Sequence, residues 1–437
     1  MKAKRIIANC SFLSQLRVGL IVFTILILPC RSLCQELPKT VPDGTEGDVL
    51  QAADSTTKAE KLPWNMFDTS FTTIKLGAGF LYEYAGYTQD ATGKRQMDSI
   101  GSELKYDFDV RDFRVLIGGQ LKTKRTITWK AGFMYDGDAK EWYVRESGVM
   151  IATPEIWGSI FIGRTKEGYS LSKVMNGYSG ESLERHMAID AIPILGDGIK
   201  WLGYLPKQRI VWNMGIFADW LSHNQGFSTY SWQFITRAAW LPIHSEEKQT
   251  TLHIGGNFRI GQPEDNMIRL KSRPESNTAP IFIDTGTFSS NQGTFVGWEI
   301  YYNKGPWLFG TEYGWQMFNS KEKNDPVFHG GEVMMSYIFT GASRPYTTTS
   351  GIYTFIPVKK SVFQGGLGEI EAALRYSTNE LNGGLIEGGR FWRITPTFNW
   401  YLSANLRFEF AYGYGILDRY SLKGATQFFQ SRIQILL

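Results

Sequence analysis

The feature that most constrains the fold of this chain is a period-two alternation of apolar and polar side chains, which recurs from residue 71 to residue 437. In the segment 406–414, LRFEFAYGY, one parity holds only Leu, Phe and Tyr, and the other holds Arg, Glu, Ala and Gly. The segments 370–376, 392–400 and 429–437 alternate in the same way. Successive side chains of a β-strand point to opposite faces, so each segment is predicted to form a strand with one apolar and one polar face. The chain is therefore expected to be all-β.

An alternating strand has two stable environments. A soluble antiparallel sandwich buries the apolar faces in its core, whereas a transmembrane barrel exposes them to lipid and keeps its lumen polar. Charged residues recur in the middle of the polar faces. Aromatic residues gather near the ends of the apolar faces, as at the two interfaces of a membrane barrel: Tyr376, Trp400, Tyr401, Tyr412 and Tyr414. These features favour a transmembrane antiparallel β-barrel, and a secreted β-sandwich stays as the alternative.

Sixteen segments carry the strand pattern, and an even number places both ends of a bacterial barrel on the periplasmic side. The segments are roughly 71–87, 100–120, 125–137, 142–153, 156–164, 198–206, 208–221, 228–242, 249–262, 293–304, 306–319, 328–341, 365–379, 388–402, 405–418 and 423–437. A further strand at 280–289 would raise the number to 18, and the sequence leaves this open.

The lengths of the connections agree with this orientation. Most connections on the periplasmic side are tight, for example those at 122–124 and 154–155. The two long connections, 165–197 and 263–292, face outward, as in a bacterial porin. The segment 342–364 is an exception, because it is long and contains prolines yet is periplasmic by parity.

The N-terminal residues differ from the rest of the chain. Basic residues precede the apolar run 18–28, which is too short to span a membrane as a helix. Residues 1–34 are therefore predicted to be a secretory signal peptide, 35–70 a flexible periplasmic extension and 71–437 the barrel. Lipid attachment at Cys30 or Cys34 is disfavoured, because Pro29 and Leu33 stand where a lipid-attachment motif requires a small residue.

Charge and cysteine content exclude several classes of protein. The chain has 46 Lys and Arg against 42 Asp and Glu, but five of the basic residues lie in the first 34 positions, which contain no acid. The remaining 41 basic residues face 42 acidic ones, so net charge does not support binding of nucleic acid. All three cysteines also lie in these 34 positions, which argues against a disulfide framework or a thiolate metal site in the exported chain.

Enzyme motifs find no match in the chain. The five histidines are scattered, without a His-Glu-x-x-His pattern, and there is no Gly-x-Ser-x-Gly elbow. No catalytic residue, cofactor or metal site is predicted.

A series of short motifs follows the strand pattern in a defined order: FRVLIGG at 113–119, FIGR at 161–164, SLER at 182–185, RPE at 273–275, EIEAALRYS at 369–377, FNWYL at 398–402 and RIQ at 432–434. In order and spacing these motifs resemble the phosphate-selective porin O and P family of Gram-negative outer membranes. The resemblance covers residues 71–437. It implies a homotrimer of 16-stranded barrels in contact with outer-membrane lipid, with the third outer loop, here 165–197, folded into the lumen as a constriction.

The resemblance also implies which residues meet the solute. The stretch 163–186 matches the family without a gap, and there it implies that Lys173 and Arg185 hold an anion at the narrowest point. Arg111 falls where the family has an arginine that lines the same constriction, and Glu146 where it has an acid that orients the cations. Alternation slips at 110–114, so a β-bulge would direct either Arg111 or Arg114 inward, and pairing with Asp112 would neutralise one of them.

The chain departs from the family at several positions. Gly79 stands where the family has an arginine, Asn176 and Gly177 replace a serine pair, and Leu437 replaces a terminal Phe. Between residues 164 and 185 four cations face three anions: Arg164, Lys166, Lys173 and Arg185 against Glu167, Glu181 and Glu184. This small positive excess is a weak bias toward anions and favours a broad or a different selectivity over strict phosphate selectivity.

The resulting hypothesis is an outer-membrane porin for small hydrophilic solutes, among them anions such as phosphate or polyphosphate. One rival is a non-conducting outer-membrane barrel, structural or receptor-like, whose own loops plug the lumen. The other is the soluble sandwich. Heat-modifiable migration on SDS gels separates a barrel from a sandwich, and conductance separates a porin from a plugged barrel.

Overall fold

The computed structural model describes residues 63–137, 140–193, 195–221 and 229–437. The predicted signal peptide and the predicted extension up to residue 62 lie outside the described residues. Within the rest of that extension, the short strand β1 (Met66–Asp68) pairs with β2 (Thr73–Gln89). In the described part of the chain, no helix combines the length and the apolar character that a membrane span requires.

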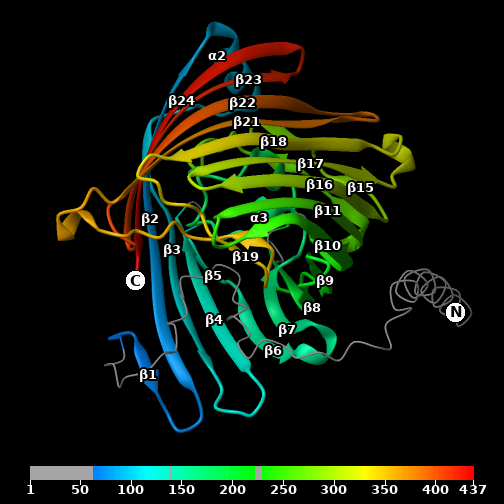
Figure 1. Ribbon diagram of the computed structural model, residues 1–437. Coiled ribbons are helices and arrows are strands. Elements are labelled where there is room, and N and C mark those ends of the chain that lie inside the picture. Colours follow the sequence, from blue (N-terminus) through cyan, green and yellow to red (C-terminus); the bar gives the residue numbers. More distant parts are fainter. Residues whose placement is uncertain (1–62, 138–139, 194, 222–228) are drawn as a thin grey trace, which may run out of the picture. The chain divides into compact units, whose positions relative to one another are not determined.

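In the described residues sixteen antiparallel strands form a closed barrel, which confirms the predicted 16-stranded antiparallel barrel (Figure 1). The barrel closes because β2, the first strand, pairs with β24, the last. Both β5 and β6 pair with β4, so together they count as one interrupted strand. After β2 the barrel strands are β3 (Asp107–Gln120), β4 (Ile127–Asp136), β5 (Glu141–Val144) with β6 (Ser147–Thr153), β7 (Gly158–Lys166), β8 (Leu195–Leu205), β9 (Ile210–Ala218), β10 (Tyr230–Ser245), β11 (Thr250–Pro263), β16 (Gly293–Lys304), β17 (Trp307–Phe318), β18 (Val327–Ile338), β21 (Glu369–Gly383), β22 (Ile386–Tyr401), β23 (Leu406–Arg419) and β24 (Leu422–Leu436).

The alternative of 18 strands is excluded. The segment 280–289 contains only the two-residue strands β14 (Ile283–Asp284) and β15 (Phe288–Ser289). They pair with β13 (Lys271–Ser272) and β12 (Met267–Ile268), inside the same long connection, and are not part of the barrel sheet.

Burial in this barrel is the reverse of burial in a soluble protein. On β21, Glu371 and Arg375 are buried, whereas the side chains of Leu374 and Tyr376 are each 41% exposed. The same inversion holds along β22, β23 and β24, where apolar side chains form the exposed parity. A soluble sandwich would bury its apolar faces, so the pattern rejects that alternative and is the one that lipid requires.

A helix lies in the connection between the first two barrel strands. The sequence pattern predicted that the second strand begins near residue 100, but residues Ala91–Ile100 form the helix α2 and the strand begins only at Asp107. The side chain of Asp90 caps the helix by accepting a hydrogen bond from the amide of Gly93 at 2.6 Å. Gly101 ends it with a φ of 71°, a left-handed conformation that glycine adopts without steric cost.

The remaining elements are short and lie in connections. They are the helix α3 (Leu171–Val174), the strands β19 (Tyr346–Thr347) and β20 (Ile352–Tyr353), and the 3₁₀ turns η1 (Pro154–Ile156), η2 (Met187–Ile189), η3 (Glu264–Asn266), η4 (Lys321–Lys323) and η5 (Val362–Gln364).

Candidate functional site

The connection between β7 and β8, residues 167–193, is held by side chains on the polar faces of strands far along the chain. The amide of Leu171 donates to Glu299 of β16 at 2.8 Å, and the hydroxyl of Ser170 donates to Glu312 of β17 at 3.0 Å. Glu184 forms an ion pair with Arg432 of β24. These contacts bind the 167–193 segment to strands from several parts of the sheet.

A second connection meets this segment from the β18–β21 side. Ile352 and Tyr353 of β20 are fully buried in an apolar cluster with Leu171 and Val174 of the 167–193 segment. Arg344 donates to the carbonyl of Ser179 in the same segment. The connection predicted as an exceptional periplasmic segment, 342–364, therefore packs against the 167–193 segment.

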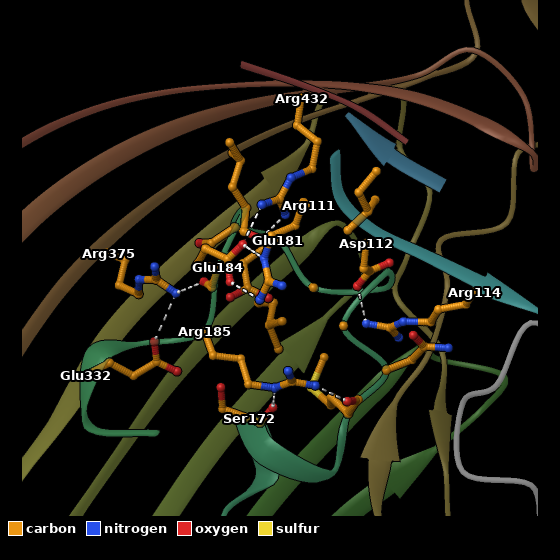
Figure 2. Close-up of a pocket in the computed structure, with 18 of the residues that line it drawn as sticks. Arg111, Asp112, Arg114, Ser172, Glu181, Glu184, Arg185, Glu332, Arg375 and Arg432 are labelled. Carbon is orange, nitrogen blue, oxygen red and sulfur yellow. Dashed lines mark hydrogen bonds and ion pairs between the residues drawn. The ribbon is translucent and has the colours of Figure 1, made fainter. Parts of the chain in front are cut away.

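A cavity of about 60 Å³ lies between the 167–193 segment and the barrel wall (Figure 2). At roughly 10–15 Å³ for each water, it has room for a few waters. Its charged lining residues are Arg111, Asp112 and Arg114 of β3, Glu181, Glu184 and Arg185 of the segment, Glu332 of β18, Arg375 of β21 and Arg432 of β24. Five arginines thus face four carboxylates.

Arg111 stands at a β-bulge. The register between β2 and β3 shifts there, because Leu81 pairs with Asp112 while Tyr82 pairs with Val110. The extra residue, Arg111, is left out of the ladder, as the slip in alternation predicted. Its guanidinium donates to both carboxylate oxygens of Glu184, at 2.8 and 3.2 Å.

Glu184 is shared between two cations. It accepts from Arg111 and from Arg432, and these two guanidiniums outweigh the effect of burial and hold its pKa well below the usual range for Glu. Glu184 is therefore ionised and neutralises charge on both arginines. The neighbouring Arg185 makes no ion pair with it.

The sequence left open whether Arg111 or Arg114 points inward, and both of them line the cavity. Arg114 pairs with Asp112 at 2.5 Å, which neutralises it as the sequence suggested for one of the two arginines. Its guanidinium lies 4.5 Å from the centre of the Tyr178 ring, and the Tyr178 hydroxyl donates to Asp112 at 2.5 Å. Arg114 is thereby held in a fixed position.

Arg185 is the lining arginine that forms no ion pair in the described part of the chain. Its guanidinium donates to the carbonyls of Ser172 and Met175, at 2.7 and 2.8 Å. Burial and the positive charges of Arg114 and Arg145 lower its pKa to about 10, which still leaves it charged near neutral pH. An anion in the cavity would offer the negative charge that this guanidinium lacks.

Lys173 is placed differently from the expectation. Its side chain is fully buried, pairs with the equally buried Glu167, and stands 3.9 Å from the centre of the Tyr169 ring. Burial lowers its pKa to about 8, against the opposing attraction of Glu167. Lys173 lines neither this cavity nor the second one described next, so the structure does not bring it together with Arg185.

Glu146 borders a second, smaller cavity with Arg145 and Lys166. It lies between β5 and β6 and forms ion pairs with Lys130 at 3.3 Å and with Lys166 at 3.8 Å. Arg114 and Asn176 line both cavities, so they stand where the two cavities meet. The predicted role of Glu146 beside a group of cations stays a prediction, and its position agrees with it.

Six charged lining residues were not among the predicted site residues: Asp112, Glu181, Glu184, Glu332, Arg375 and Arg432. Arg375 and Arg432 lie on the polar parities of the late strands β21 and β24. Each pairs with an acid on a neighbouring strand, Arg375 with Glu332 at 3.6 Å and Arg432 with Glu83. Each also pairs with an acid of a connection, Arg375 with Glu275 of 264–292 at 2.6 Å and Arg432 with Glu184. Alternation in the sequence could therefore have placed these side chains on the polar face of their strands. It could not show which connection each side chain contacts.

Solved structures with the same architecture are outer-membrane proteins. The anion-selective porin of Comamonas acidovorans is 11% identical, with a TM-score of 0.52 over 84% of this chain and 100% of that one. The channel DcaP of Acinetobacter baumannii is 8% identical, with a TM-score of 0.52 over 85% and 99%. A loop-deletion mutant of OmpT of Vibrio cholerae is 12% identical, with a TM-score of 0.51 over 84% and 99%. At these identities the likeness concerns the fold.

Sequence comparison identifies the family. An uncharacterized protein of Caulobacter vibrioides is 28% identical over 182 residues, which is 41% of this chain and only 36% of that protein. The family model of the phosphate-selective porins O and P matches residues 82–434, nearly the whole barrel. The chain therefore belongs to the phosphate-selective porin O and P family of Gram-negative outer membranes.

Proposed function

We propose that this protein is a porin through which small anions, phosphate among them, diffuse across the outer membrane. The observation that carries the proposal is the arginine-lined cavity between the 167–193 segment and the barrel wall. A porin needs donors that replace the hydration shell of a solute without holding it permanently. Guanidinium groups suit phosphate and carboxylate in this way, because each presents several N–H donors in a planar fork.

The charge balance along both cavities supports an anion preference of modest strength. Together they are lined by seven cations and five carboxylates: Arg111, Arg114, Arg145, Lys166, Arg185, Arg375 and Arg432 against Asp112, Glu146, Glu181, Glu184 and Glu332. In a narrow space with low-dielectric walls, a net charge of this size sets the sign of the local potential. Because most of the cations are paired, a broad preference for anions fits better than strict selection of phosphate.

The 167–193 segment is proposed to be the inward-folded third loop that narrows the pore, with Arg185 and Arg111 as the residues that meet the anion. Its hydrogen bonds to Glu299 and Glu312 support this, because both acids lie on the buried polar faces of their strands. Glu146 and Arg114 are proposed to position the cations. We also propose a trimer, as the family resemblance implies.

A second candidate is a barrel plugged by its own connections. The burial of Tyr353 and Ile352 against Leu171 favours it, because segments from both ends of the barrel strands meet there in an apolar contact. In that case the small cavity would hold water but would not conduct.

Electrical recording decides between the two candidates. Purified protein inserted into planar lipid bilayers should give stepwise conductance, and a tenfold KCl gradient should give a reversal potential of the sign expected for anion preference. Replacing chloride by phosphate on one side tests whether phosphate passes. Absence of conductance from protein that shows heat-modifiable migration would reject the porin and favour the plugged barrel.

A further inference from the structure

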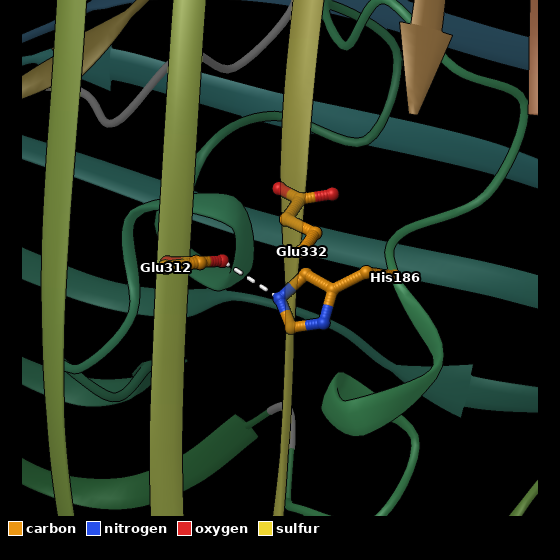
Figure 3. A group of neighbouring side chains, drawn as sticks. All are labelled: His186, Glu312 and Glu332. Carbon is orange, nitrogen blue, oxygen red and sulfur yellow. Dashed lines mark hydrogen bonds and ion pairs between the residues drawn. The ribbon is translucent and has the colours of Figure 1, made fainter. Parts of the chain in front are cut away.

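Three side chains from separate parts of the chain converge beside the cavity: His186, Glu312 and Glu332 (Figure 3). His186 belongs to the 167–193 segment, Glu312 to β17 and Glu332 to β18. Each offers a nitrogen or oxygen atom within 4.8 Å of those of the other two, and all three residues are at least nine-tenths buried. In Figure 3 the imidazole lies beside the strand that carries Glu332, and one of its nitrogens points toward Glu312 on the neighbouring strand.

From this geometry we propose that His186, Glu312 and Glu332 bind a divalent transition-metal ion, Zn²⁺ in the first instance, which fastens the 167–193 segment to the barrel wall. One imidazole nitrogen and two carboxylates are a donor set that Zn²⁺ accepts readily, with a water as fourth ligand. Ligands at about 2.0–2.2 Å in tetrahedral geometry stand roughly 3.4 Å apart. His186 Nε2 and Glu312 Oε1 are hydrogen-bonded at 2.8 Å, and the ligand atoms of the three residues all lie within 4.8 Å of one another. Adjustments of about 1 Å in these side chains would therefore place the three atoms around one ion.

The charge around the three residues favours a cation. Two buried carboxylates within 4.8 Å of each other repel unless a positive charge stands between them. Arg375 approaches Glu332 at 3.6 Å, but it is also engaged by Glu275 at 2.6 Å. A divalent ion would balance the charge of both carboxylates at once, and Arg375 would then pair with Glu275 alone.

Two atoms of the group have unused bonding capacity. Among the residues that the structure describes, Glu332 Oε2 and His186 Nδ1 have no hydrogen-bond partner although both are buried. A buried polar atom without a hydrogen bond costs free energy. Arg375 approaches Glu332 Oε2 only at 3.6 Å, and a metal ion would supply the close contact that this oxygen lacks. This is a second observation, independent of the spacing, that points to a ligand.

Surrounding groups hold the acids in orientation, as outer-sphere partners do in metal sites. Glu312 accepts from the hydroxyl of Ser170 at 3.0 Å and from the amide of Leu171 at 3.1 Å. Tyr301 donates to the other oxygen of Glu332, Oε1, at 3.2 Å. Glu332 also lines the cavity, so an ion can reach the site through the same space as the solute.

The sequence alone predicted no metal site, because its rules depend on ligands that are close together in the chain. Here the histidine and the first acid are 126 residues apart, and only the packing of the 167–193 segment against β17 and β18 brings them together. The proposal does not depend on ion conduction, since a plugged barrel would contain the same three residues.

Zinc binding to the purified full chain tests the site. After treatment with EDTA and removal of the chelator, Zn²⁺ is titrated calorimetrically into the protein in detergent, and bound zinc is counted by elemental mass spectrometry. One ion for each chain is expected. His186→Ala and Glu332→Gln should each weaken binding by at least the roughly 10–100-fold that loss of an outer-sphere partner causes.

His329→Ala is the matched control, because His329 lies on the same strand as Glu332 but at the opposite parity, bonded to the Tyr313 hydroxyl. It should bind zinc like the unmodified protein. Zn²⁺ should also raise the temperature of the heat-modifiable gel shift in the unmodified chain and in His329→Ala, but not in His186→Ala. No saturable binding to the unmodified chain, or binding that survives both His186→Ala and Glu332→Gln, would overturn the proposal, and the first of these outcomes would leave His186 and Glu312 as an ion pair only.

Discussion

Replacement of Glu184 by Gln changes the charge of the arginine-lined cavity at its most central point. Glu184 accepts two hydrogen bonds from Arg111 and also pairs with Arg432, so one carboxylate screens two cations from a passing ion. Gln keeps an acceptor oxygen and nearly the same volume. The lining would change from five arginines and four acids to five arginines and three acids.

The size of the effect follows from distance. Arg111 Nε stands 2.8 Å from Glu184, and an anion bonded to the far side of the guanidinium would stand about 6 Å from that carboxylate. One unit charge at ~6 Å is worth about 0.7 kcal/mol in a water-like dielectric. It acts on anions and cations with opposite sign, so their permeability ratio changes by about tenfold. Screening at about 0.1 M salt reduces the energy to roughly half, which predicts a rise of about three- to tenfold.

The assay is the reversal potential of single channels in a tenfold KCl gradient, converted to an anion-to-cation permeability ratio. Glu155→Gln is the control, because it removes the same charge from an exposed turn residue that pairs with Arg125 and lines neither cavity. Its ratio should equal that of the unmodified protein. An unchanged ratio in Glu184→Gln, or a shift toward cations, would refute the idea that this cavity sets selectivity.

Three further outcomes are expected. Arg185→Met should lower the anion-to-cation ratio in the same recording, and a ratio that does not fall would remove Arg185 from the anion path. Lys173→Met should instead destabilise the folded barrel by about 3–5 kcal/mol, read from urea-induced unfolding, because it leaves the buried Glu167 without its cation; a larger effect on selectivity than that of Arg185→Met would contradict this. Deletion of residues 346–353 should raise single-channel conductance, since this stretch packs on the 167–193 segment, and an unchanged conductance would show that it does not narrow the pore.

Most of the barrel could be predicted from the sequence because residues two apart in a strand lie on the same face, so the lipid-facing and lumen-facing residues alternate along the chain. The sixteen predicted segments correspond to the sixteen barrel strands, with ends that differ by a few residues in most cases. The helix α2 was missed because the strand pattern leaves 88–99 as a connection and these residues carry no regular apolar stripe. Its signal was local: Asp90 before it and Gly101 after it, which are the residues that cap a helix.

The site was harder to predict, since parity shows which face a side chain occupies but not what covers that face. Alternation and motif position led to Arg111, Arg114 and Arg185, and all three line the cavity. Position within the same motif also led to Lys173, yet its neighbour Glu167 and the Tyr169 ring enclose it. The irregular backbone of the 167–193 segment determines whether a cation lines the cavity or pairs with a carboxylate. Alternation in the sequence does not predict the course of such a backbone.

The same reasoning explains why so many arginines produce so little net charge. The connections packed against the polar face are irregular, so their carbonyls have no ladder partners and need donors from the wall. Arginines supply them: Arg375 donates to the carbonyl of Glu184 at 2.8 Å, Arg419 to that of Phe282 at 2.8 Å, and Arg237 to that of Gly351 at 2.7 Å.

Two of these three arginines are also balanced by an acid, because a buried unpaired charge is costly. Arg375 pairs with Glu275 and Arg237 with Glu299, at 2.6 Å in both cases. The near-equality of basic and acidic residues in the barrel is therefore a consequence of holding its connections in place. In the proposed function, selectivity depends on the few guanidiniums, Arg185 first among them, whose hydrogen bonds to backbone carbonyls are not accompanied by a carboxylate.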